Sequence, residues 1–257
     1  MEERDELESL IRDVRAALAD QIARGVRTEP LTDRSRAAAP ARAAEPRVVQ
    51  DWSSRAESAR SAGPTGAAAL RAVRDELGDC RRCALCKTRK NIVFGVGSAE
   101  ADLVVVGEGP GAQEDQQGEP FVGPAGQMLD KMLQHVLGLS RAEAYILNVV
   151  KCRPPRNRNP LPEEVDACRP FMNQQLSAIE PKVILVLGSV AYKTLLNTAQ
   201  GITRARGRWH IWRDPVTDRA IPVMPTFHPS YLLRAYNKEA KRMAWEDLKK
   251  VLHHVYG

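Results

Sequence analysis

The sequence contains no run of about 18 apolar residues, which is the length that a membrane-spanning helix requires. Its first ten residues, MEERDELESL, are acidic and lack the basic start of a secretion signal. We therefore expect a cytoplasmic protein with no membrane segment. Of the 257 residues 43% are hydrophobic, which is enough to build the core of a globular domain.

Cysteine is scarce and its number is odd, which argues against a disulfide framework in the cytoplasm and favours a metal site. The five are Cys80, Cys83, Cys86, Cys152 and Cys168. Cys80 and Cys83 form a C-x2-C turn, and 15 residues separate the later pair. Four thiolates in two pairs suit either tetrahedral zinc or an iron–sulfur cluster, and spacing alone does not choose. We expect Cys86 to be a free thiol, because residues 85–89 lead the chain away from the site.

Acidic residues do not balance the basic ones in the C-terminal portion. Residues 1–66 hold 11 Arg and 12 Asp or Glu, which leaves 27 basic and 20 acidic residues, a net charge of +7, for the rest. Such a surplus suits a polyanion such as nucleic acid, although many basic proteins bind none. Charge alone therefore leaves the partner open.

The first 66 residues divide into two parts. Apolar residues recur at steps of four and three within residues 1–27, which predicts an amphipathic helix; they are Leu7, Ile11, Val14, Leu18 and Ile22. This helix would dock on its own domain, or bind a protein partner or a second copy of itself. Residues 28–66 are rich in Ala, Arg, Ser and Pro with few large apolar residues, which predicts a flexible linker.

From residue 67 to 257 short apolar runs alternate with helical patterns. The runs at 102–107, 144–150, 182–188 and 220–229 predict strands, and helices are expected at 124–138, 162–179, 189–197 and 237–255. This order predicts an α/β domain in which helices cover both faces of a parallel sheet. Ligands in such folds bind beyond the carboxyl ends of the strands. Polar clusters fall there at residues 107–115, at Asn148 and at residues 228–230.

Four motifs in this domain resemble one known family. They are CRRCALCKTRKNIVFGVG from Cys80, GEGPGAQEDQQGEPFVGPAGQML from Gly107, LNVVKCRPPRNRNPLPEEVDAC from Leu147, and HPSYLLR from His228. Together they resemble the family 4 uracil-DNA glycosylases, the iron–sulfur branch of the uracil-DNA glycosylase superfamily. The resemblance runs from about residue 77 to the end and does not extend to residues 1–66.

The resemblance implies a three-layer α/β/α sandwich around a central four-stranded parallel sheet. It also implies a [4Fe–4S] cluster on Cys80, Cys83, Cys152 and Cys168, with Cys86 as a spectator. The implied activity is DNA repair: a monomeric enzyme flips uracil out of single- or double-stranded DNA and hydrolyses its N-glycosidic bond. The products are free uracil and an abasic site.

The resemblance places the uracil pocket on Gly109, Phe121, Asn148 and His228. The permissive backbone of the glycine-rich turn lets short loops approach the flipped nucleotide. Phe121 offers a face on which uracil stacks, and the alternative is an ordinary core phenylalanine. The Asn148 amide suits the O4 acceptor and N3–H donor of uracil and not cytosine, which offers the reverse. His228 donates to uracil O2, where negative charge builds as the bond breaks.

Three carboxylates of the second motif are candidates for the water step. One of them should orient or deprotonate the water and offset positive charge on the sugar. The resemblance favours Glu114 for this task and gives Glu108 a place near C5 of the base. Asp115 is a third catalytic candidate, and the alternative for it is a loop cap.

Basic and apolar residues beside these motifs are expected to contact DNA. An apolar side chain after His228 could fill the hole that the extruded base leaves, while arginines hold phosphates. The expected residues are Lys151, Arg153, Arg156, Arg158, Tyr231, Leu232 and Arg234. The arginines beside Cys152 would alternatively only neutralise the negative charge of a cluster.

Three other functions compete with this one. A Rossmann-like nucleotide or redox protein is disfavoured, because GEGPGA lacks the G-x-G-x-x-G spacing and has proline within the turn. A DNA-binding module with a structural metal and no catalysis would bind uracil-containing DNA without releasing the base. Some superfamily relatives trap the sugar covalently on a histidine, but residues 151–160, KCRPPRNRNP, contain none, which favours turnover.

Overall fold

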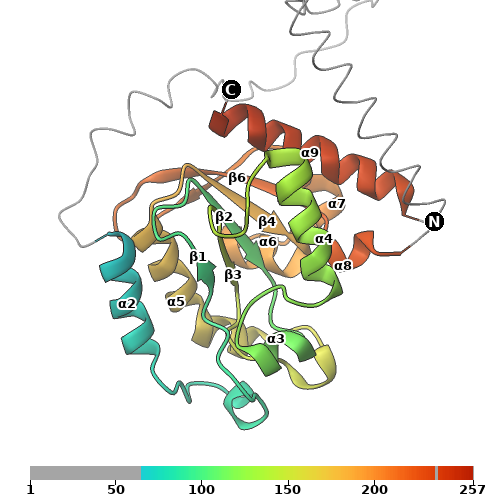
Figure 1. The fold of residues 1–257 in the computed structure, drawn as a ribbon. Coiled ribbons are helices and arrows are strands. Elements are labelled where there is room, and N and C mark those ends of the chain that lie inside the picture. Colours follow the sequence, from blue (N-terminus) through green and yellow to red (C-terminus); the bar gives the residue numbers. More distant parts are fainter. Residues whose placement is uncertain (1–64, 235–236, 257) are drawn as a thin grey trace, which may run out of the picture. The chain divides into compact units, whose positions relative to one another are not determined.

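The computed structural model describes residues 65–234 and 237–256 of the chain. The expected helix over 1–27 and all but the last two residues of the expected linker lie outside the described residues. The described part of the chain is an α/β domain with helices packed on a twisted sheet (Figure 1). No helix in this part of the chain combines the length and apolar character needed to cross a membrane.

The sheet is mixed and has six strands in the order β1-β3-β2-β4-β6-β5. The strands are β1 (Val96–Gly97), β2 (Leu103–Gly107), β3 (Tyr145–Asn148), β4 (Val183–Leu187), β5 (His210–Arg213) and β6 (Ala220–Thr226). β3, β2, β4 and β6 pair in parallel, whereas β1 and β5 pair antiparallel with β3 and β6 at the two edges. The expected purely parallel sheet of four strands therefore needs correction, because an antiparallel strand extends it at each edge.

The helices fall on both faces of this sheet. They are α2 (Gly66–Leu77), α3 (Ala112–Gln117), α4 (Pro124–Met132), α5 (Pro162–Ile179), α6 (Gly188–Leu196), α7 (Ile202–Ala205), α8 (Pro229–Leu232) and α9 (Lys238–Tyr256). Short helical turns complete the domain at η1 (Ala84–Lys87), η2 (Leu133–Leu137) and η3 (Pro155–Asn157). In Figure 1, α4 and α9 lie on one side of the sheet, and α2 and α5 lie on the other.

The alternation of side chains along each strand divides the core between the two faces. Val104 and Val106 of β2 belong to a cluster that includes residues of α5 and α6. Leu103 and Val105 of the same strand belong to a second cluster, with residues of α4, η2 and α9. Because both faces are covered, every residue of β2 and of β4 is buried. This buried sheet is the rigid base on which the loops at its carboxyl edge stand.

Candidate active site at the carboxyl edge of the sheet

The glycine-rich turn after β2 leads directly into α3, and a carboxylate braces it. One Glu114 oxygen accepts a hydrogen bond from the Gly111 N–H at 3.1 Å. The other accepts from Val122 N at 3.0 Å and Gly123 N at 2.9 Å. Glu114 therefore joins the turn after β2 to the loop that carries Phe121. A side chain at position 111 would meet this carboxylate, because a Cβ there would lie 2.7 Å from Glu114 Oε2.

Phe121 and Asn148 meet above the end of β2. A Cβ on Gly107 would lie 2.4 Å from Asn148 Oδ1 and 2.5 Å from Phe121 Cζ, so only glycine leaves room for both side chains. Phe121 is 5% exposed and also belongs to the core on the α4 side. The structure thus brings together two of the expected pocket residues, from segments 27 residues apart in the sequence.

Asn148 ends β3 and carries an unusual acceptor. Its side chain is 2% exposed. Within the described residues, the buried Oδ1 atom accepts no hydrogen bond. An unpaired buried acceptor costs about 1–3 kcal/mol, so such an atom in a folded protein calls for a reason. A ligand with a donor at this position would satisfy it.

His228 begins α8 beyond the end of β6, and its half-buried ring lies near Phe121. The two ring centroids are 5.7 Å apart at an interplanar angle of 31°. The Ser230 N–H donates to His228 Nδ1 at 3.2 Å, so the neutral ring carries its proton on Nε2. Burial lowers the pKa of His228 to about 4, although the charge of Glu114 acts in the opposite direction. The imidazole is therefore neutral at pH 7.

Gly188 is what allows His228 to lie this close to the sheet. It joins β4 to α6 with φ of +86°, in the left-handed region that glycine adopts without a steric penalty. A Cβ at this position would lie 3.0 Å from the Cβ of His228. The end of β4 therefore forms part of the wall behind the histidine.

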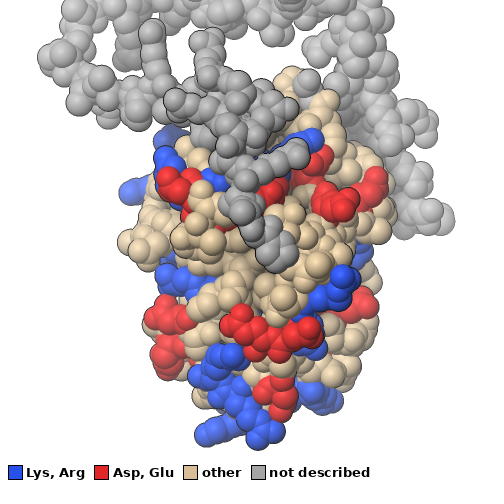
Figure 2. Space-filling model, turned by 90° about the vertical axis from the view of Figure 1, so that its left-hand side faces the viewer, with Lys and Arg blue, Asp and Glu red and all other residues tan. Residues whose placement is uncertain are grey.

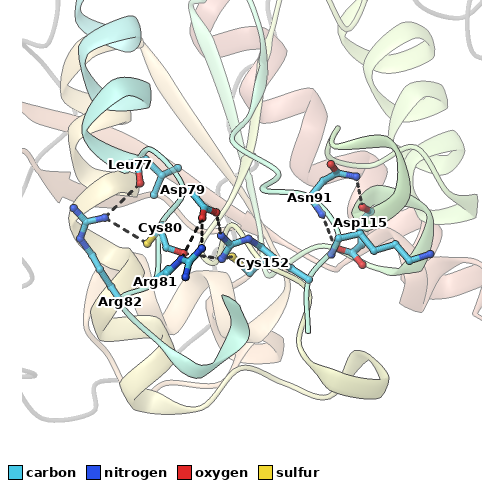
Figure 3. Close-up of polar contacts among 10 residues, drawn as sticks. Leu77, Asp79, Cys80, Arg81, Arg82, Asn91, Asp115 and Cys152 are labelled. Carbon is cyan, nitrogen blue, oxygen red and sulfur yellow. Dashed lines mark hydrogen bonds and ion pairs between the residues drawn. The ribbon is translucent and has the colours of Figure 1, made fainter. Parts of the chain in front are cut away.

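The other expected residues of the turn have distinct surroundings. Burial raises the pKa of Glu108 above its usual value. Gly109 faces the loop after β3, since a Cβ there would lie 2.7 Å from Val150 Cγ2. Asp115 Oδ1 accepts hydrogen bonds from the backbone N–H groups of Lys90 at 2.8 Å and Asn91 at 3.3 Å. Asp115 thus fastens α3 to the segment before β1 (Figure 3).

Four of the five cysteines line one small pocket between the end of α2, the loop after β3 and α5. Its lining includes Cys80, Cys83, Cys152 and Cys168, and Cys86 is not part of it. Burial raises the pKa of the thiols of Cys83, Cys152 and Cys168. In residues 65–234 and 237–256, no three His, Cys, Asp or Glu side chains are arranged so that they could hold one metal ion.

Cationic and backbone donors point at these sulfur atoms, as a negatively charged thiolate centre would require. Arg82 Nη1 lies 3.4 Å from Cys80 Sγ, and Arg89 Nη1 lies 3.5 Å from Cys152 Sγ (Figure 3). The Lys151 N–H donates to Cys168 Sγ at 3.3 Å. Arg89 also donates to the Cys80 carbonyl at 2.7 Å, which joins the two cysteine segments. The donor set therefore fits an anionic sulfur-ligated group.

Two residues expected at the DNA surface are buried, and a third forms an ion pair. Lys151 is 1% exposed and donates through Nζ to the Asn148 carbonyl at 2.8 Å, so it holds the main chain of Asn148 in place. Arg158 places two guanidinium nitrogens on Glu164, at 2.7 and 2.8 Å. Leu232 is 1% exposed because it packs into the core on the α4 side. Lys151 and Leu232 are therefore not placed to meet a phosphate or a base stack, whereas the Arg158 side chain is 37% exposed and its contact with DNA stays a prediction.

Other expected DNA contacts are at the surface. Arg156 is exposed, and Tyr231 is 40% exposed with its ring 5.2 Å from that of Phe227. Arg153 donates to Asn157 Oδ1, and the Arg234 guanidinium lies 5.8 Å from the Tyr231 ring. On the face seen in Figure 2, Lys and Arg lie at the lower end with Asp and Glu among them, where Figure 1 places the loop after α2.

Several residues of this site escape sequence reasoning. The sequence contains 17 glycines, and only the structure shows that Gly107 and Gly188 leave room for neighbouring side chains. Arg141 donates to the main chain of residues 120 and 121, about twenty positions away, and no local pattern marks it. Ser230 was visible as part of the HPS motif, yet its role in fixing the His228 proton follows only from the bond to Nδ1.

Comparison with known proteins agrees with this architecture. The model of the uracil DNA glycosylase superfamily matches residues 94–249. A type-4 uracil-DNA glycosylase from Sulfurisphaera tokodaii is 39% identical over 186 residues, which are 71% of this chain and 83% of that protein. One from Thermotoga maritima is 43% identical over 179 residues, 69% of this chain and 90% of that protein. A type-5 uracil-DNA glycosylase from Pyrobaculum aerophilum is 32% identical over 171 residues, 61% and 71% of the two chains.

An α/β domain that matches these proteins over most of its length defines the class of protein. The chain belongs to the uracil-DNA glycosylase superfamily. This confirms the resemblance drawn from the four sequence motifs.

Proposed function

We propose that this protein is a uracil-DNA glycosylase of the type-4 kind, a DNA repair enzyme that hydrolyses the N-glycosidic bond of uracil in DNA. The relatives named above support this function. Within the molecule, one observation carries it: the buried and unpaired Oδ1 of Asn148 lies beside Phe121, whose ring is 5.7 Å from that of His228. An amide, an aromatic face and a neutral imidazole together suit a flat, polar base.

Asn148 would select uracil over cytosine. Its Oδ1 can accept the N3–H of uracil, whereas N3 of cytosine is itself an acceptor and would leave two buried acceptors facing each other. A site built to pair one hydrogen-bonding pattern rejects the other, because the unmatched polar groups remain buried without partners. Lys151 holds the main chain of Asn148 in place for this contact.

His228 would stabilise the departing base. Its Nε2–H would donate to uracil O2 as the bond to the sugar breaks and negative charge moves onto the ring. A neutral donor already held in position needs no reorganisation when that charge develops. The low pKa of His228 keeps the ring in this neutral state, with Nδ1 occupied by Ser230.

We propose that Glu114 orients the attacking water and offsets the positive charge of the sugar. Its charge acts on the nearby His228, and three backbone N–H groups hold its two oxygens. Glu108 would border the base near C5, together with the close backbone of Gly109. We assign Asp115 a structural role, because its oxygen is bonded to the backbone of residues 90 and 91.

For the cysteine pocket we propose a [4Fe–4S] cluster on Cys80, Cys83, Cys152 and Cys168. When bound, the cluster would supply four iron–thiolate bonds that join the loop after α2 to the loop after β3 and to α5. Arg89 and the Lys151 N–H would stabilise the thiolates. Because Lys151 also supports Asn148, this arrangement fixes the floor of the pocket.

DNA would cross the carboxyl edge of the domain. We propose Arg153, Arg156 and Arg234 as phosphate contacts and Tyr231 as the apolar side chain beside the extruded nucleotide. We further propose that the protein acts as a cytoplasmic monomer. For residues 1–27, the two alternatives of a helix docked on its own domain or on a partner both stand.

The test is uracil release from otherwise identical oligonucleotides containing one uracil or one cytosine. Wild-type protein should leave alkali-labile abasic sites at uracil and none at cytosine. Asn148→Ala should lose most of the activity while its melting temperature changes little. Intact uracil strands with DNA binding retained would favour the non-catalytic alternative, and a denaturant-stable protein–DNA adduct would favour covalent trapping.

A further inference from the structure

The main chain at Phe121 adopts a conformation that it would not choose by itself. Its φ is +54°, in the left-handed region that residues with a Cβ rarely occupy. Such a conformation persists only where neighbouring groups hold it. Since the ring direction follows from the main chain, whatever holds this peptide also sets the direction of the ring.

Arg141 holds this peptide from one side. Its Nη1 donates to the Phe121 carbonyl at 3.0 Å, and its Nη2 donates to the Pro120 carbonyl at 2.7 Å. The planar guanidinium presents its donors in a fixed fork, which suits two successive carbonyls. Asp130 of α4 accepts from the same Nη1 at 2.8 Å, and both side chains are about one-third exposed or less. The ion pair therefore keeps the fork in one orientation.

The same peptide also lies directly against α4. A Cβ on Gly126 would lie 1.7 Å from the Phe121 carbonyl oxygen, so α4 passes directly against it. Glu114 binds the N–H groups of the next two residues, Val122 and Gly123. The backbone on each side of Phe121 is thus fixed, while its ring lies against Gly107 and near His228.

We propose that Arg141 is a positioning residue for uracil binding, which acts through Phe121. Together with Asp130 it keeps the left-handed peptide in place, so that the ring face is preformed for the base. This inference rests on the proposed function. Arg141 itself would touch neither the base nor the sugar, because its described bonds run to main-chain carbonyls and to Asp130.

Arg141→Lys keeps the positive charge but removes the fork. Base stacking is worth a factor of about 5 to 150 in affinity, so we expect the Kd for free uracil to rise about tenfold. KM for a single-stranded uracil oligonucleotide should rise in parallel, with a smaller change in kcat. The matched control is Arg219→Lys: Arg219 pairs with Glu180 at 3.3 Å, is 22% exposed, and lies at the opposite, amino end of β6. This control should leave both constants unchanged.

Combination with Phe121→Ala separates positioning from a general loss of structure. If Arg141 acts through the ring, Arg141→Lys in the Phe121→Ala background should change uracil affinity by less than about twofold. An additive effect of the two substitutions, or an unchanged Kd for uracil in Arg141→Lys alone, would overturn the proposal. Should Arg141→Lys fail to fold, Asp130→Asn weakens the same clamp while retaining Arg141, and the same two comparisons apply to it.

The outcome also distinguishes this inference from the proposed function. Wild-type protein that neither binds nor releases uracil would contradict the proposed function. Active wild-type protein with Arg141→Lys indistinguishable from Arg219→Lys would contradict only the positioning role.

Discussion

The direction of each side chain in this molecule depends on the residues that pack around it. The motifs predicted that Phe121, Asn148 and His228 share one pocket, and the structure places the three at the carboxyl edge of the sheet. The predictions for Lys151 and Leu232 were wrong for a common reason. Both lie in motifs rich in basic or polar residues, but packing turns Lys151 under Asn148 and Leu232 into the core. A motif identifies residue types, and only the fold decides their direction.

The ionisation of His228 gives a prediction at this scale. Because burial lowers its pKa to about 4, the ring stays neutral as the pH falls below 6.5. Activity should therefore show no loss with a midpoint near 6.5, and loss through His228 should appear only near pH 4. The measurement is kcat for uracil release between pH 4 and 8. His228→Ala should lower kcat by about 10²–10³, as removal of one preorganised donor does elsewhere. A midpoint near 6.5 that disappears in His228→Ala would contradict the lowered pKa of His228.

The lowered pKa of His228 also predicts how the stability of the protein depends on pH. A histidine whose folded pKa lies below its unfolded value contributes stability that is fully present above pH 6.5 and is lost as the pH falls toward 4. Compared with His228→Asn, which has no such group, wild-type protein should lose more of its free energy of unfolding between pH 7 and pH 4.5. Equal losses in denaturant titrations at the two pH values would show that the ring is not desolvated.

At the scale of elements, hydrophobic patterns predicted the strands that are buried on both faces. β2 and β4 are continuous apolar runs, and α5 occupies the range expected for it. The two edge strands were not predicted from the sequence. β1 has only two residues, and three of the four residues of β5 are exposed or half-buried, so neither forms an apolar run. The expected helix over 124–138 is α4 followed by the π-helical turn η2. Helix α2 was not predicted, although Leu70, Val73 and Leu77 follow a helical period.

A buried ion pair joins three elements behind the histidine loop. Asp247 of α9 is fully buried and accepts hydrogen bonds from Arg206, after α7, and from Thr226 Oγ1 at the end of β6, at 2.7 Å. Asp247→Ala would leave the Arg206 guanidinium partly buried without its carboxylate, which should cost about 3–5 kcal/mol in the free energy of unfolding. Uracil release should also weaken, because Thr226 lies two residues before His228.

The control for this prediction is an exposed ion pair on the same helix. Glu239→Ala removes the partner of Arg242, in a pair whose side chains are 68% and 62% exposed, and should change stability little. Denaturant unfolding of the two variants beside wild-type protein makes the comparison. Equal stability of Asp247→Ala and Glu239→Ala would show that α9 is not anchored through Asp247.

At the scale of the whole molecule, the cysteine pocket is lined by segments that lie far apart in sequence. If the proposed cluster is bound here, replacing Cys168 by Ser should remove its iron and visible absorbance and lower the melting temperature, because the loop after β3 would lose its link to α5. Cys86→Ser is the matched control and should retain both, since Cys86 does not line the pocket. The measurement is the iron content of the two purified variants. Wild-type iron content in Cys168→Ser would remove Cys168 from the ligand set, and zinc in place of iron would overturn the cluster.

The distribution of charge predicts how the molecule holds DNA. Removal of one side chain that binds a phosphate should reduce the slope of log K against log salt by about 0.7 for single-stranded DNA. We expect this change for Arg156→Ala, at the exposed turn after β3. Arg213→Ala should leave the slope unchanged, because Arg213 lies opposite Ala220 at the amino end of β6, away from the pocket. Binding to a uracil-free oligonucleotide at several salt concentrations provides the slopes, and equal slopes for both variants would remove Arg156 from the DNA surface.

A crystal structure of the protein with free uracil tests the central claim most directly. We predict a uracil ring stacked on Phe121, with N3 about 2.9 Å from Asn148 Oδ1 and O2 at the same distance from His228 Nε2. Uracil bound away from these three side chains, or an Asn148 Oδ1 that stays unpaired with uracil in the pocket, would contradict it.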